Sequence, residues 1–69
     1  MSILQRFSDG IRRSRKQLGL TQEQAAEALS ISVRSFQYIE SGKRIPSTIL
    51  TLNIIAVLGI QGKNLREEK

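Results

Sequence analysis

The chain has 69 residues, of which eleven are Lys or Arg and six are Asp or Glu, for a formal net charge of +5. Neither Cys nor His occurs, which excludes disulfides and thiolate chemistry and removes the commonest general base and metal ligand. We therefore expect no enzymatic activity, no metal and no cofactor.

This length predicts one domain over residues 1–69, near the lower size limit for an independent core, where dimerisation is a common source of stability. The positive charge favours a polyanionic partner, either nucleic acid or an anionic membrane surface. No apolar run approaches the ~20 residues of a transmembrane helix, and the first residues do not resemble a signal peptide. The expected location is the cytoplasm, without a membrane partner.

The first predicted helix covers residues 2–18. Ser2 and Gln5 offer a capping box at its start, and Gly19 is expected to end it in the left-handed conformation. A buried stripe is predicted from apolar residues at helical spacing: Leu4, Phe7, Ile11 and Leu18. Three basic residues lie off this stripe, and a solubilising role and a phosphate contact are about equally expected for each: Arg12, Arg13 and Lys16.

The middle of the chain predicts two short helices joined by a tight turn. Thr21 and Gln24 form a capping box for a helix over residues 22–29, which has a small-residue inner face. Ser32 is expected to cap a second helix over residues 33–41.

The second of these helices has two different faces. Phe36 and Ile39 point toward the core, and the opposite face carries groups that suit base-pair edges in a DNA major groove: Arg34, Gln37, Tyr38 and Ser41. A solvated surface is the commoner explanation for such a face on an isolated helix, but the neighbouring elements favour DNA. The loop that begins at Gly42 places Lys43 and Arg44 where they could reach flanking phosphates.

Arg15 lies one position from the apolar stripe of the first helix. Charged residues this close to a core are usually paired. We therefore expect a structural ion pair between Arg15 and Glu40, which would fix the first helix against the third.

Ser47 is expected to cap a fourth helix over residues 48–58. Its predicted core side consists of Thr48, Thr51, Leu52, Ile55 and Leu58. The opposite side is also largely apolar, and we expect it to contact a second copy of the chain about a two-fold axis, through Ile49, Leu50, Asn53, Ala56 and Val57. The alternative is a stripe covered by the tail. Ile60 and Leu65 could anchor a last short helix over residues 63–68.

Several motifs at consistent spacing resemble the helix-turn-helix family of phage repressors and Cro proteins, also called the XRE family. They are LGLTQ, an apolar residue at position 31, YIESGKR and the Pro that follows, and the likeness covers residues 7–60. This resemblance implies an all-α, compact bundle of five short helices in which the third is the recognition helix.

The resemblance also implies roles by position. Base contacts fall to Val33, Arg34, Gln37 and Tyr38. Backbone contacts fall to Gln22, Ser32, Ser35, Lys43 and Arg44. Gln22 is further expected to brace the recognition helix, and the positions of Arg15 and Glu40 match the structural ion pair of the family. Ser30 stands where a turn glycine is common, so a non-glycine residue must adopt an unusual backbone conformation there.

The expected function is that of a sequence-specific, double-stranded-DNA-binding transcriptional regulator from a bacterium, phage or plasmid, associated with the nucleoid. A homodimeric repressor on a palindromic operator is the favoured form, with half-sites ~34 Å apart. The alternatives are a restriction–modification controller, an antitoxin-type regulator, or a protein-interaction module on the same scaffold. Nothing in the sequence indicates a small-molecule ligand.

Overall fold

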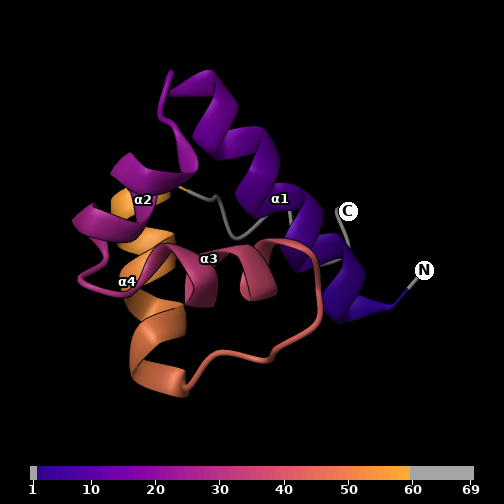
Figure 1. The fold of residues 1–69 in the computed structure, drawn as a ribbon. Coiled ribbons are helices and arrows are strands. Elements are labelled where there is room, and N and C mark those ends of the chain that lie inside the picture. The colour runs from indigo at the N-terminus through magenta and orange to yellow at the C-terminus, as the bar shows by residue number, and fades with distance from the viewer. Residues whose placement is uncertain (1, 60–69) are drawn as a thin grey trace.

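The computed structural model describes residues 2–59, in which four helices and no strand occur (Figure 1). The helices are α1 (Ile3–Gln17), α2 (Gln22–Ala28), α3 (Val33–Glu40) and α4 (Thr48–Leu58). The predicted all-α fold is confirmed, and the boundaries of these four helices lie within one residue of their predicted positions. The expected helix over residues 63–68 lies outside the described residues, as do its proposed anchors, Ile60 and Leu65.

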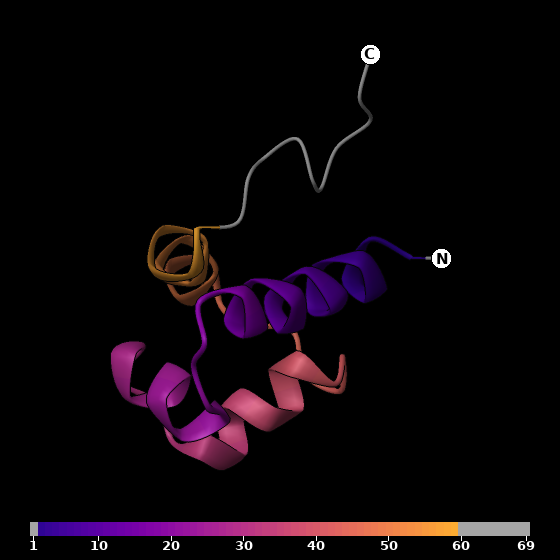
Figure 2. The ribbon, with the colours of Figure 1, turned by 90° about the horizontal axis from the view of Figure 1, so that it is seen from above.

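The four helices enclose one core. α2 packs against α3, and α1 packs against both α3 and α4. Figure 2 shows α1 and α4 on one side of the molecule and the α2–α3 pair on the other. All four helical segments contribute to the buried apolar cluster: Phe7, Ile11, Ala25, Ala26, Leu29, Phe36, Ile39, Ile54 and Leu58. Burial of one large aliphatic or aromatic side chain stabilises the fold by about 1.5–3 kcal/mol.

A hydroxyl residue caps the N-terminus of each of these four helices. The side chains of Ser2, Thr21, Ser32 and Ser47 each accept a hydrogen bond from the backbone N–H three residues later. Such a cap contributes about 1 kcal/mol because it satisfies a donor that the helix leaves free. The capping box at Thr21 is complete. The one expected at Ser2 is only half formed, because the Gln5 side chain instead donates to Asp9 Oδ1 at 3.2 Å.

The first three helices end in the same hydrogen-bond pattern, in which a residue with positive φ reverses the chain. After α1 this residue is Gly19, with φ 73°, and after α3 it is Gly42, with φ 79°. After α2 it is Ser30, with φ 60°, so the unusual backbone conformation expected at this position is present. The N–H of Ser30 donates to Glu27 O and the N–H of Ile31 donates to Ala26 O. The turn after α2 therefore has the same hydrogen bonds as the other two helix ends, but its residue of positive φ is a serine and not a glycine.

Three predicted core positions are wrong: Leu18, Leu52 and Thr48, the last of which is exposed at the start of α4. Leu18 is 53% exposed, because α1 ends at Gln17 and Leu18 is its C-cap. On α4, Leu52 is 58% exposed, whereas Ile54 is fully buried. The buried side of α4 is rotated from the predicted one and consists of Leu50, Thr51, Ile54, Ile55 and Leu58, of which Ile54 and Leu58 are fully enclosed. Apolar residues occur almost all around this helix, so periodicity could not identify the side that faces the core.

Arg15 and Glu40 form an ion pair between α1 and the end of α3. Arg15 Nε donates to Glu40 Oε2 at 2.7 Å, and Arg15 Nη1 donates to the carbonyl of Leu20 at 2.9 Å. Glu40 is only 4% exposed, so its carboxylate depends on protein donors. The pair therefore joins α1, the α1–α2 connection and α3 at one point.

Replacing Ser30 by Gly is expected to raise the free energy of unfolding by about 1 kcal/mol, because a non-glycine residue in the left-handed region costs roughly that amount. The matched control is Gly19→Ala, which adds a Cβ at the equivalent place after α1, where no atom lies within 4 Å. It should lower the free energy of unfolding by a similar amount. Thermal unfolding measures both, and changes of the same sign would contradict this account.

Replacing Arg15 by Met leaves the Glu40 carboxylate buried without its cation. Loss of one partner of a buried ion pair costs about 3–5 kcal/mol, which is comparable to the total stability of so small a domain. We expect urea unfolding to show a largely unfolded variant, and partial recovery when Glu40→Leu is added. Lys16→Met, on the exposed side of α1, should leave the midpoint nearly unchanged. Equal midpoints for Arg15→Met and Lys16→Met would show that the pair contributes little.

Candidate nucleic-acid interface

The outward face of α3 is polar and carries no acid. Arg34, Gln37 and Tyr38 are exposed on it, while Phe36 and Ile39 on the opposite side are buried in the core. These residues recur at the spacing that separates two faces of a helix. A guanidinium, an amide and a phenol are therefore held outward by two buried anchors.

Val33, the fourth expected base contact, is placed differently. Its side chain is half-buried and packs against the core cluster. Only part of its surface is available to a ligand at the start of α3. An apolar edge at this point suits the methyl group of a thymine better than a polar base edge.

The N-terminus of α3 offers several hydrogen-bond donors. Ser32 Oγ accepts from the N–H of Ser35 at 3.1 Å and lies 3.0 Å from Ser35 Oγ, to which it donates. The hydroxyl hydrogen of Ser35 is thereby left for another acceptor. The backbone N–H groups of Val33 and Arg34 belong to the first turn, which has no intrahelical acceptors. Together with the helix dipole, these donors favour an anionic group at this end.

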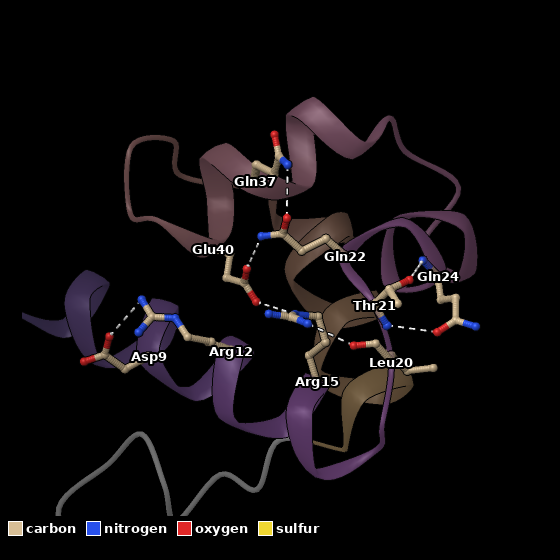
Figure 3. A network of polar contacts seen from close by, with 9 residues as sticks. All are labelled: Asp9, Arg12, Arg15, Leu20, Thr21, Gln22, Gln24, Gln37 and Glu40. Atoms are coloured by element: carbon tan, nitrogen blue, oxygen red, sulfur yellow. Dashed lines mark hydrogen bonds and ion pairs between the residues drawn. The ribbon is translucent and has the colours of Figure 1, made fainter.

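A chain of side-chain hydrogen bonds connects α3 to the interior (Figure 3). Gln37 Nε2 donates to Gln22 Oε1 at 3.0 Å, and Gln22 Nε2 donates to Glu40 Oε1 at 2.7 Å. Glu40 in turn accepts from Arg15. The amide of Gln37 therefore has a defined orientation, set by a residue of α2. The contact between Gln22 and Gln37 has no signature in the sequence, because it joins two exposed amides that lie 15 residues apart.

The turn after α3 adds positive charge beside the same face. Lys43 and Arg44 are exposed, and Arg44 Cζ lies 5.4 Å from the centroid of the Tyr38 ring. A guanidinium over an aromatic face is attracted by the ring quadrupole, so Arg44 and Tyr38 order each other. Glu40 is the one acid of α3 and is neutralised by Arg15. Arg34 is a third exposed cation on this face, and none of the three forms an ion pair within residues 2–59.

An open hollow of about 420 Å³ collects several of these residues where α1, α2 and α3 meet. It is lined by Arg12, Gln22, Gln37, Tyr38, Glu40, Ser41 and Lys43. Of these lining residues, Arg12 could not be distinguished by the sequence from two other basic residues of α1, Arg13 and Lys16. Its helix position gave no signal, since only the packing of α1 against α3 decides which basic residue borders the hollow.

The expected dimer residues of α4 are exposed with one exception. Ile49 is 68% exposed, and Asn53, Ala56 and Val57 are exposed as well. Leu50 is half-buried and packs against the core, so the prediction that it faces outward is wrong. Leu52 lies on the outward side in its place.

A second hollow, of about 460 Å³, lies between the start of α1 and the start of α4. It is lined mainly by apolar residues: Ile3, Leu4, Phe7, Ile45, Pro46 and Thr51. Exposed apolar side chains therefore gather on α4 and the segment before it, apart from the polar face of α3.

Within residues 2–59, no group of three or more side chains is suited to hold a metal ion. Over the same residues, no helix combines the length and the apolar character needed to cross a membrane.

Comparison with known proteins places the chain in a family. A model described as a helix-turn-helix domain matches residues 6–68. The chain is 43% identical over 49 residues, 71% of its own length and 71% of the relative's, to an uncharacterized HTH-type transcriptional regulator of Methanothermobacter thermautotrophicus. No solved structure matches it significantly. The matched region includes α2, the turn at Ser30 and α3 with its polar outward face, and the chain belongs to the helix-turn-helix domain family.

Proposed function

We propose that this protein is a DNA-binding transcriptional regulator that inserts α3 into the major groove of double-stranded DNA. The observation that best supports this proposal is the outward face of α3, which is polar and free of exposed acids. Its Gln37 side chain is oriented by a hydrogen bond to Gln22. Family membership and the regulator named above support the same conclusion. A helix of this kind fits the major groove, where every base pair presents a distinct donor and acceptor pattern.

The exposed side chains of α3 recognise the DNA bases. Arg34 can donate two hydrogen bonds to guanine O6 and N7, the commonest specific contact in protein–DNA complexes. Gln37 keeps its carbonyl oxygen and one amide hydrogen for a base, since only one hydrogen is donated to Gln22. Tyr38 offers a hydroxyl, and the exposed edge of Val33 can contact a thymine methyl group.

Backbone contacts fix the position of α3 in the groove. Ser35 offers a free hydroxyl hydrogen, Gln22 keeps one amide hydrogen after its bond to Glu40, and Lys43 and Arg44 supply charge. Ser32 acts mainly through its cap, because its hydroxyl is already engaged with Ser35. Phosphate contacts of this type carry affinity without sequence information.

The proposed active form is a homodimer that acts as a repressor. The exposed apolar side of α4 supports it, with Leu52 replacing Leu50 among the expected contacts: Ile49, Leu52, Asn53, Ala56 and Val57. Two copies would read half-sites ~34 Å apart on a palindromic operator. The same apolar side favours a protein-interaction role as the second candidate, in which a different protein occupies it. Restriction–modification control and antitoxin activity are special cases of the same DNA-binding form.

The first test is selection of binding sites from random duplex DNA at physiological salt, followed by affinity measurements with two variants. Arg34→Ala should relax the preference at one base position and cost about 1–3 kcal/mol on the selected site. Lys43→Ala should weaken binding to selected and scrambled DNA alike and reduce the salt dependence by about one charge.

Equal behaviour of the two variants on both DNAs would show that the base and backbone roles are assigned wrongly. Binding by the wild type without enrichment of any site would remove sequence-specific reading. Absence of DNA binding would favour the protein-interaction role.

Replacing Ile49 by Asp should convert the dimer to a monomer, since it places a charge in the centre of the proposed apolar contact. Sedimentation equilibrium measures the change, with Leu18→Asp as control because Leu18 is also an exposed large apolar residue but lies at the end of α1. An unchanged dimer for Ile49→Asp would move the interface away from α4. A wild type that stays monomeric at all concentrations and on the selected DNA would eliminate the homodimer.

A further inference from the structure

We infer that the open hollow where α1, α2 and α3 meet is a binding site for a DNA backbone phosphate, in which Arg12 of α1 is a principal ligand. This inference rests on the proposed function and extends it, because it assigns a DNA contact to the first helix. The hollow has a volume of about 420 Å³ and borders the same face of α3 that carries Gln37 and Tyr38. At roughly 30 Å³ for each water, it accommodates a phosphate group together with part of its hydration.

The charge of the hollow is positive. Among residues 2–59, the cations that line it are Arg12 and Lys43, which come from α1 and from the turn after α3. The acid that lines it is Glu40, whose side chain is 5% exposed and whose two oxygens accept from Arg15 Nε and Gln22 Nε2, both at 2.7 Å. The Arg15–Glu40 pair contributes no net charge. An anion in the hollow therefore meets two cations and a carboxylate that is already neutralised.

Arg12 is free to turn toward such an anion. Its Nη2 atom lies 3.9 Å from Asp9 Oδ1, and the side chains of Arg12 and Asp9 are 49% and 30% exposed. The distance is too long for a hydrogen bond, and Asp9 Oδ1 already accepts from Gln5. A surface ion pair of this kind contributes little, and a charge-assisted hydrogen bond to phosphate is stronger.

The neutral lining groups fit an acceptor-only ligand. Gln22 retains one amide hydrogen after donating to Glu40, and Tyr38 contributes a phenol. Ser41 is not a donor here, because its hydroxyl donates to the carbonyl of Tyr38 at 3.1 Å. A phosphate oxygen accepts hydrogen bonds and carries negative charge, so it matches this set of donors.

The location identifies the source of the phosphate. The hollow shares Gln37 and Tyr38 with the face that we assign to bases, so DNA held against α3 brings its backbone over the hollow. A contact from α1 would anchor the duplex at a second helix and fix the angle at which α3 enters the groove. Phosphate contacts determine register and orientation in this way.

The adjacent residue, Arg13, provides a matched control. It has the same chemistry and is exposed on the same helix, but it does not line the hollow. Consecutive helical residues point about 100° apart, which separates the two side chains. Differences between Arg12→Ala and Arg13→Ala therefore report on the hollow and not on total charge.

The experiment measures affinity for the selected DNA site over a range of salt concentrations. Arg12→Ala should bind about tenfold more weakly at low salt and reduce the slope of log K against log salt by about 0.9, the value for one phosphate. Arg13→Ala should retain the wild-type slope. Circular dichroism melts should agree for the two variants, which confirms that both are folded.

A second measurement locates the phosphate with duplexes that carry one neutral methylphosphonate at successive backbone positions. Wild type and Arg13→Ala should lose affinity at one position, and Arg12→Ala should lose clearly less there, because only Lys43 remains as a cation of the hollow. Equal slopes for the two variants, or an Arg12→Ala variant that keeps the wild-type sensitivity at every position, would overturn the inference. If the hollow binds free phosphate and not the DNA backbone, Arg12→Ala should keep the wild-type sensitivity at every backbone position. A wild type that binds no DNA would instead overturn the proposed function, and the two failures are therefore distinguishable.

Discussion

Glu40 places a carboxylate almost completely inside a small helical domain, and much of the structure is arranged around its two oxygens. One oxygen accepts from Arg15 of α1 and the other from Gln22 of α2, while the backbone of Glu40 forms the last turn of α3. Three helices are thereby joined at one charged group. A buried carboxylate is stable only when it is paired and hydrogen-bonded, so the relative positions of these helices are restricted to those that supply both donors.

This restriction extends to the surface through the two glutamines. Because Gln22 is fixed by Glu40, its carbonyl oxygen is available at a defined place for Gln37. A residue on the outward face of α3 is therefore oriented by the interior of the protein. Side chains that are oriented before binding lose less conformational entropy on binding. The buried side chains of Phe36 and Ile39 fix α3 to the core. The hydrogen bonds from Glu40 through Gln22 orient the Gln37 amide, which we assign to base contact.

Most of the local structure follows from the sequence because it depends on neighbours in the chain. Hydroxyl residues start each helix, and residues with positive φ end the first three, so the boundaries were predictable to one residue. The two faces of α3 and its positive surroundings were predictable for the same reason. The family match over residues 6–68 covers α2, the turn and α3, where these local features lie.

Only the tertiary structure decided which side of α4 faces the core and which basic residue of α1 borders the hollow. α4 is apolar on nearly all sides, so the burial of Ile54 and the exposure of Leu52 depend on how α4 packs against α1. Arg12 and Arg13 are equivalent in sequence, and the packing of α1 against α3 distinguishes them. The sequence by itself determined the helices, their ends, the polar face of α3 and the net charge, since these depend on residue type and short-range spacing. The orientation of whole helices depends on contacts between residues far apart in the chain, which short-range patterns do not contain.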